Sequence, residues 1–140
     1  MVIQRWQSIY LLLAIFAMVL VFIRPFCYLE AMDGGAISAL VPLDYPVFLT
    51  VNILTTILLF IDIFLFRNLR LQRMVAAICL LLMIASAITV GIILYNLSGN
   101  WKIEWGGAPV GLVCALICTF FARYRMGKDE ETLRSYDRIR

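Results

Sequence analysis

The chain has 140 residues, of which 64% are hydrophobic and 15% are charged, and its mean hydropathy is +0.95. Soluble domains are nearer half apolar and a quarter charged, so this composition is that of a membrane protein. The chain contains no histidine, which removes the commonest general base and the commonest metal ligand.

Four segments meet the requirement of about 20 mostly apolar residues for a membrane-spanning helix. They cover approximately residues 6–23, 46–66, 74–95 and 107–124. The first is expected to be an uncleaved anchor, because the bulky and charged residues 22–26 follow it where a signal peptide would have a small-residue cleavage site. The sequence therefore predicts one all-α domain over residues 1–140, an integral membrane antiparallel four-helix bundle.

The basic residues are distributed unevenly about these spans. Ten of the twelve lie on one side, in the N-terminus, in the loop between the second and third spans and in the C-terminal tail. The opposite side has only Arg24 and Lys102. Because Lys and Arg accumulate in cytoplasmic loops, both termini are predicted to be cytoplasmic. This topology explains the net charge of +3, and no nucleic-acid partner is expected.

The first and third loops, residues 24–45 and 96–106, mix apolar and polar residues. Residues 101–105, with the sequence WKIEW, alternate with the period of two that is typical of a strand. Gly34-Gly35 is a candidate hairpin turn in the first loop. We expect a small extracytoplasmic β cap of two or three short strands.

Asp62 is the single acid within the predicted spans, and an ionisable residue at such a position is a functional candidate. It lies about one and a half helical turns before Arg67, near the cytoplasmic interface. We favour a structural carboxylate that snorkels to the interface or pairs with Arg67, Arg70 or Arg5.

Asp62 ends a polar stripe on the second span, whose other members are Asn52, Thr55, Thr56 and Leu59. Such a stripe can line the path of a small transporter or channel component, or supply interhelical hydrogen bonds of about 1 kcal/mol each. The sequence favours the second interpretation, because the spans contain neither a histidine nor a buried basic residue.

Small residues recur at four-residue spacing in two spans, as Gly107, Gly111 and Ala115 in the fourth and as Ala87 and Gly91 in the third. Small residues allow helix backbones to approach closely in membranes. We expect them to pack within the chain rather than against a partner's helix.

The four cysteines, Cys27, Cys79, Cys114 and Cys118, do not have the spacing of a zinc site or of a secreted disulfide framework. A thiol–quinone oxidoreductase would need reactive cysteines at the outer face, where only Cys27 is predicted to lie. This activity is a second alternative, and no catalytic residue, metal or cofactor is expected.

The tail contains a favourable i, i+4 pair, Glu130 and Arg134, and an apolar edge formed by Leu133, Tyr136 and Ile139. A separate cytoplasmic helix over about residues 128–140 is predicted after Gly127. It would lie in solvent or on the membrane surface, or dock a cytoplasmic partner.

Both ends of the chain resemble a small family of four-span inner-membrane proteins of Bacteroidota, catalogued as a domain of unknown function. The N-terminal residues 1–13 are similar to its opening motif MIQRIQS-YLLL, and residues 105–109 to its WGAALP motif. Residues 128–140 are similar to its KDE-LVRSADRIR tail, with Tyr136 in place of an alanine. The resemblance implies a bacterial inner-membrane location and the same topology, but no activity.

The polar ends and the absence of a catalytic set favour a non-enzymatic scaffold or accessory subunit of a membrane assembly. Its expected partners are the lipid bilayer and a membrane or cytoplasmic protein that binds the tail. A tail carboxylate is expected to pair with Arg5, and no motif specifies an oligomeric state. The candidate interaction residues are Gln4, Arg5, Asp62, Lys128, Asp129, Glu130, Arg134, Asp137 and Arg138.

Overall fold

The computed structural model describes the chain except for residues 1–2, 32–34, 36, 100 and 139–140, and its described side chains begin at Trp6 and end at Tyr136. Four long helices form the bundle: α1 (Ile3–Ile23), α2 (Pro46–Phe64), α3 (Leu69–Leu97) and α4 (Ala108–Arg138). Each is long and apolar enough to cross a membrane, so the chain is a multi-pass membrane protein. The predicted all-α four-helix membrane bundle is confirmed.

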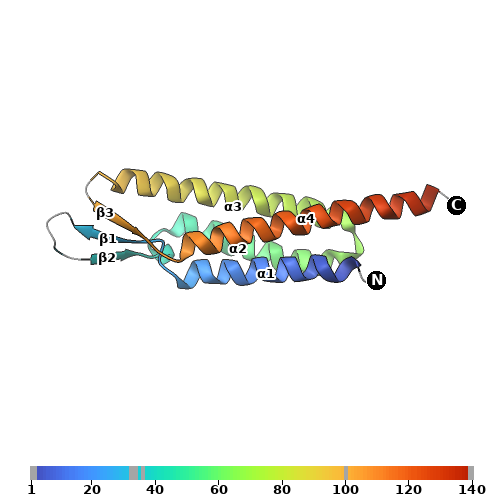
Figure 1. The fold of residues 1–140 in the computed structure, drawn as a ribbon, viewed down its shortest axis with the longest axis horizontal. Helices are drawn as coiled ribbons and strands as arrows, with labels where there is room; N and C mark the ends of the chain where they lie inside the picture. Colours follow the sequence, from blue (N-terminus) through green and yellow to red (C-terminus); the bar gives the residue numbers. More distant parts are fainter. Residues whose placement is uncertain (1–2, 32–34, 36, 100, 139–140) are drawn as a thin grey trace.

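The helices are antiparallel and follow one another around the bundle, so that α1 packs against α2 and α4, and α3 packs against the same two helices. Both chain termini lie at one end and three strands lie at the other (Figure 1). We refer to these as the termini end and the sheet end. The 3₁₀ turn Leu65–Arg67 joins α2 to α3 at the termini end.

The buried side chains recur at alternating spacings of four and three residues on every helix. This spacing of 3.5 residues is typical of left-handed bundle packing. The core positions are Gln7, Leu11, Ala14, Met18 and Val21 on α1; Phe48, Asn52, Thr55, Leu59 and Asp62 on α2; Gln72, Ala76, Cys79, Met83, Ser86 and Val90 on α3; and Ala108, Leu112, Ala115, Thr119, Ala122 and Met126 on α4. The outward faces carry large apolar side chains such as Leu12, Phe16 and Ile57, as expected of surfaces that contact lipid.

The small residues of α4 pack within the chain, as predicted. A Cβ at Gly111 would lie 3.0 Å from the carbonyl oxygen of Ala17 and 3.1 Å from Cγ2 of Val21, so α1 approaches closely here. Ala115 is fully buried one turn later. On α3 the prediction is wrong for Gly91, where a Cβ would meet nothing within 4 Å, whereas Ala87 packs against the core.

The strands β1 (Cys27–Ala31), β2 (Ile37–Leu40) and β3 (Trp101–Trp105) form an antiparallel sheet in the order β2–β1–β3. Cys27 is paired with Leu40 of β2 and with Trp105 of β3. The predicted β cap from the first and third loops is therefore confirmed, whereas the predicted Gly34-Gly35 turn lies partly outside the described residues.

Gly106 connects the sheet to α4 through a close backbone approach. Its N–H donates a hydrogen bond of 2.8 Å to the carbonyl oxygen of Phe26. A Cβ at this position would overlap the carbonyl oxygen of Pro25. Glycine is therefore required where the β3–α4 connection crosses the α1–β1 connection.

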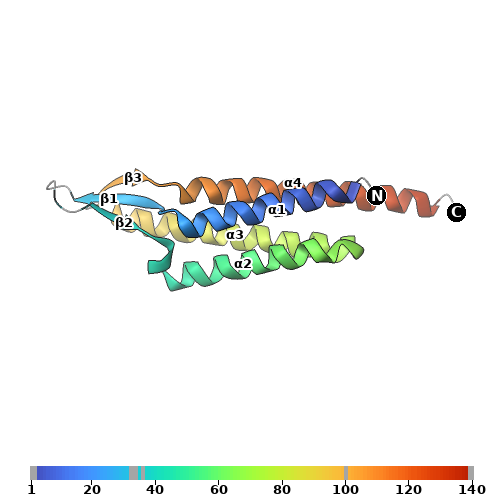
Figure 2. The same cartoon turned by 90° about the horizontal axis from the view of Figure 1, so that it is seen from below.

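Two helix boundaries differ from the prediction, both at the termini end. α3 already begins at Leu69, and α4 continues through Gly127 to Arg138 instead of ending near Tyr124. The segments concerned are rich in Arg, Lys, Gln, Glu and Leu, which are strong helix formers, and one interior glycine costs only about 1 kcal/mol. As a result, α4 projects beyond the start of α1 and beyond the α2–α3 turn (Figure 2).

Candidate functional site

Four polar residues, one from each helix, form the last level of the core at the termini end. We call Gln7, Asp62, Gln72 and Asp129 the polar layer. The Gln7 amide nitrogen Nε2 donates a hydrogen bond to Oδ2 of Asp129, which joins α1 to α4. The Gln72 amide nitrogen donates to the backbone carbonyl of Asp62 over 3.1 Å, which joins α3 to α2. The layer thus links the helices in two pairs.

The core spacing explains why these four residues share a level. Gln7 and Gln72 each precede an apolar core residue by four positions, Leu11 and Ala76. Asp62 and Asp129 each follow a core residue, Leu59 and Met126, by three positions. In an antiparallel bundle, the first core position of two helices lies beside the last core position of the other two.

Sequence reasoning missed two members of the layer, Gln7 and Gln72. Neither is among the predicted interaction residues, yet each is only 1% exposed. The signal that identifies both is their heptad position: Gln7 precedes Ala14, and Gln72 precedes Cys79, by seven residues.

Asp62 is fully buried, with 0% of its surface exposed. Neither of its carboxylate oxygens has a hydrogen-bond partner among the described residues, and neither does Oε1 of Gln72. The predicted snorkelling is therefore wrong. The predicted pairs with Arg67 and Arg70 are also wrong, because neither arginine forms an ion pair with Asp62 where side chains are described. The side chain of Arg5, the third predicted partner, lies outside that region.

The polar layer therefore has three buried acceptor oxygens that receive no hydrogen bond from the described residues. An unpaired carboxylate in a low-dielectric interior costs several kcal/mol, so this arrangement is stable only with a compensating donor. Protonation of the Asp62 carboxyl, a bound cation or a hydrogen-bond donor from a partner would lower this cost.

The polar stripe of α2 faces the bundle interior but bonds within its own helix. Nδ2 of Asn52 and the hydroxyls of Thr55 and Thr56 donate to the carbonyls four residues earlier, each over 2.8 Å. The interhelical bonds predicted for these three residues are therefore wrong. Asn52 and Thr55 are buried, so they line no open aqueous path in this conformation.

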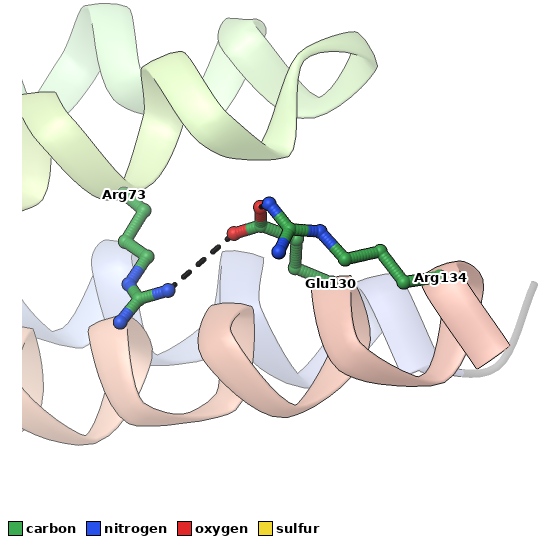
Figure 3. A network of polar contacts seen from close by, with 3 residues as sticks. All are labelled: Arg73, Glu130 and Arg134. Atoms are coloured by element: carbon green, nitrogen blue, oxygen red, sulfur yellow. Dashed lines mark hydrogen bonds and ion pairs between the residues drawn. The ribbon is translucent and has the colours of Figure 1, made fainter.

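An ion-pair cluster lies beside the polar layer, toward the tip of α4. Nη1 of Arg73 on α3 lies 3.4 Å from Oε2 of Glu130 on α4 (Figure 3). Nη2 of Arg134 lies 2.8 Å from the other oxygen of the same carboxylate, which confirms the predicted Glu130–Arg134 pair. Exposed ion pairs contribute about 0–1 kcal/mol, so the cluster orients α4 against α3 more than it stabilises the fold.

The remaining predicted interaction residues are at the same end. Asp129 bonds to Gln7, and the Lys128 ammonium lies 5.0 Å from the centre of the Tyr124 ring. The backbones of Gln4 and Arg5 belong to α1, and those of Asp137 and Arg138 to α4, whereas their side chains lie outside the described region. The pair between Arg5 and a tail carboxylate consequently stays a prediction.

The cysteines do not form a reactive pair in the described structure. All four are free thiols, and Cys79, Cys114 and Cys118 lie within the spanning helices. Cys27 lies in β1, where burial raises the pKa of its thiol. Because the thiolate is the reactive form, this environment disfavours a redox role for Cys27.

Comparison with known proteins agrees with the resemblance of the chain ends. Residues 3–139 match the model of a family described as a domain of unknown function, DUF4293. The chain belongs to this family. No curated protein and no solved structure matches the chain. The family description states no activity, so the function of this DUF4293 domain has to be argued from its own structure.

Proposed function

We propose that this DUF4293 domain is a non-enzymatic scaffold or accessory subunit that binds a protein partner through the projecting end of α4. The observation that supports the proposal most directly is the unbroken continuation of α4 beyond the polar layer. Residues 131–136 of this continuation are all exposed.

The projecting segment has the surface of a docking helix. Leu133 and Tyr136 are 55% and 68% exposed and lie three residues apart, so they share one face. Glu131 and Arg134 place charges of both signs beside them. A short apolar edge flanked by charges suits binding in the apolar groove of a partner protein.

The distribution of basic residues supports a cytoplasmic position for this segment. The termini end carries ten of the twelve Lys and Arg residues, and such residues accumulate on the cytoplasmic side of a bacterial inner membrane. A single cysteine at position 136 in a cysteine-free chain should react with an impermeant thiol reagent only after the cells are permeabilised. Labelling of intact spheroplasts would reverse the proposed orientation.

Affinity purification from a mild detergent tests the docking proposal. The intact chain is expected to recover a stoichiometric protein partner, and the pair Leu133→Ser and Tyr136→Ser to lose it. The matched control is Leu81→Ser with Tyr95→Ser, which places the same changes on exposed positions of α3. Recovery of a monomer without partners from the intact chain would contradict the proposal.

One observation favours a second candidate, a small transporter or channel component. Asp62 and Asn52 carry buried acceptor oxygens that have no hydrogen-bond partner in the described part of the chain, and a permeating proton or cation can use them. Single cysteines at positions 52, 55 and 59 should then react with a water-soluble thiol reagent. If all three resist the reagent while a cysteine at position 136 reacts, the stripe has only a structural role.

A further inference from the structure

A groove on the outer surface of the bundle runs between α3 and α4. Its part nearest the termini end, which we call the basic pocket, has a volume of about 350 Å³ and is lined by residues that include Arg73, Arg123 and Lys128. The part nearer the middle of the bundle, the apolar groove, has a volume of about 470 Å³ and is lined entirely by apolar residues, among them Leu80 and Ile84.

The two parts adjoin at Phe120, which lines both. On α3, Arg73 and Leu80 are seven residues apart and therefore share a face. On α4, Tyr124 of the basic pocket follows Phe120 by one turn. Along the α3–α4 surface, a cationic hollow at the termini end is therefore followed by an apolar one nearer the bundle middle.

The basic pocket has an excess of positive charge. Its lining contains three cationic side chains and one carboxylate, Glu131. Arg123 forms no ion pair where side chains are described, and Arg73, although paired with Glu130, remains half exposed. The pocket thus presents cations with unsatisfied donors at the level where the bundle surface changes from apolar to charged.

Gly127 shapes the pocket floor. A Cβ at this position would lie 3.7 Å from the guanidinium carbon of Arg73, so any larger side chain would extend into the space beside that group. The absence of a side chain at Gly127 therefore leaves free the part of the Arg73 guanidinium next to it, while Nη1 pairs with Glu130.

We propose that this groove binds an anionic phospholipid from the leaflet at the termini end, with its phosphate in the basic pocket and an acyl chain in the apolar groove. Basic pockets between membrane helices are suited to anionic headgroups, and a lining without polar groups is suited to a hydrocarbon chain. A free phosphate would use only the basic pocket, whereas a phospholipid would use both parts, which adjoin at Phe120. The inference does not depend on the proposed docking function.

Native mass spectrometry of the full chain in mild detergent tests the proposal with three probes: phosphatidylglycerol, phosphatidylcholine and glycerol phosphate. Each Lys or Arg near a net anionic headgroup contributes about fivefold in affinity, and the choline cation of phosphatidylcholine offsets its phosphate charge, so phosphatidylglycerol should bind at least about tenfold more tightly than phosphatidylcholine. Glycerol phosphate should not be retained. Equal binding of the two lipids would overturn the proposal, and retention of glycerol phosphate as tightly as phosphatidylglycerol would reassign the pocket to free phosphate.

Paired variants locate the binding. Arg123→Gln with Lys128→Gln should weaken phosphatidylglycerol binding about tenfold or more and leave phosphatidylcholine unchanged. The matched control, Arg70→Gln with Arg125→Gln, removes two exposed charges from the same end of α3 and α4, outside the pocket lining. An equal loss of phosphatidylglycerol affinity in both double variants would show diffuse attraction to the charged surface and would overturn the proposed site.

A second pair of variants keeps the charge constant. Gly127→Phe fills the basic pocket and should weaken phosphatidylglycerol binding alone, whereas Ile84→Trp fills the apolar groove and should weaken both lipids. Circular dichroism and a monodisperse elution profile establish that each variant is folded. Unchanged phosphatidylglycerol binding in folded Gly127→Phe would overturn the proposal even if the arginine and lysine variants fail to fold.

Discussion

Helices α1 and α4 approach closely through small side chains and share a polar contact, Gln7–Asp129, whereas the polar contact that joins α2 to α3 at the same end is, among the described residues, the Gln72–Asp62 hydrogen bond alone. At the first interface, Gly111 lets the α4 backbone approach Ala17 of α1. At the second, the amide of Gln72 bonds to the backbone of Asp62. Close packing gains dispersion energy along the whole interface, and a single hydrogen bond fixes one level. We therefore expect the α1–α4 interface to contribute more to stability than the α2–α3 interface, and the Gln72–Asp62 bond to fix the register of α2 against α3.

The largest effect is expected from Gly111→Leu, because a Cβ alone would already lie 3.0 Å from the carbonyl oxygen of Ala17. Forcing α1 and α4 apart should lower the free energy of unfolding by about 3 kcal/mol. Unfolding in mixed micelles of mild and denaturing detergent, followed by circular dichroism, measures this change.

The matched control is Gly91→Leu, the same substitution on an α3 surface with nothing within 4 Å of the new Cβ. It should leave the free energy of unfolding unchanged or raise it by up to about 1 kcal/mol, because glycine is a poor helix former. Equal destabilisation by both substitutions would mean that α1–α4 packing has no special importance.

A smaller effect is expected from Gln72→Leu, which removes the bond to the Asp62 backbone. Hydrogen bonds between membrane helices contribute about 0.6–1.7 kcal/mol, so the free energy of unfolding should fall by about 1 kcal/mol. Thr55→Val is the control, because the Thr55 hydroxyl bonds only to its own helix. If the control has the larger effect in the same detergent titration, the polar layer does not set the register.

Asp62→Asn should keep the chain folded and either leave its stability unchanged or raise it by up to about 1 kcal/mol. The substitution retains the shape of the side chain, removes a charge that has no described donor and adds two N–H donors. The detergent titration at neutral pH measures the change. A loss of more than about 2 kcal/mol would show that the Asp62 carboxyl has a partner that Asn cannot replace.

The smallest effect is expected from Glu130→Gln, which removes both the Arg73 and the Arg134 contacts. Exposed ion pairs are weak and screened by salt, so stability should fall by less than about 1 kcal/mol at low ionic strength and be unaffected at high salt. An effect that does not change with salt would indicate packing rather than charge.

The apolar repeats predicted the four helices well, because a hydrocarbon layer tolerates only segments whose backbone groups are paired internally. The WKIEW alternation likewise predicted β3, and the i, i+4 spacing predicted the Glu130–Arg134 pair. In each case the decisive signal is local in the sequence.

The polar layer was not predicted, because its signal depends on tertiary packing. Gln72 is a polar residue near a charged turn, and hydropathy alone places it in the loop. Only its heptad position relative to Cys79 and its contact with Asp62 show that it belongs to the core. The continuity of α4 was missed for a related reason: Gly127 is a helix breaker by propensity, yet helix formers on both sides and packing against Arg73 outweigh that preference.

The unbroken α4 also determines how the projecting segment moves. With 31 residues, α4 is about 46 Å long at 1.5 Å per residue, which exceeds the roughly 30 Å of bilayer hydrocarbon. A partner bound near Leu133 would therefore be held on a stiff rod instead of a flexible tether, at a fixed height and direction relative to the bundle. The entropy cost of orienting the docking surface is already met when the bundle folds, so it does not oppose binding. A lateral force on the bound partner would be transmitted along α4 as torque on the α1–α4 interface.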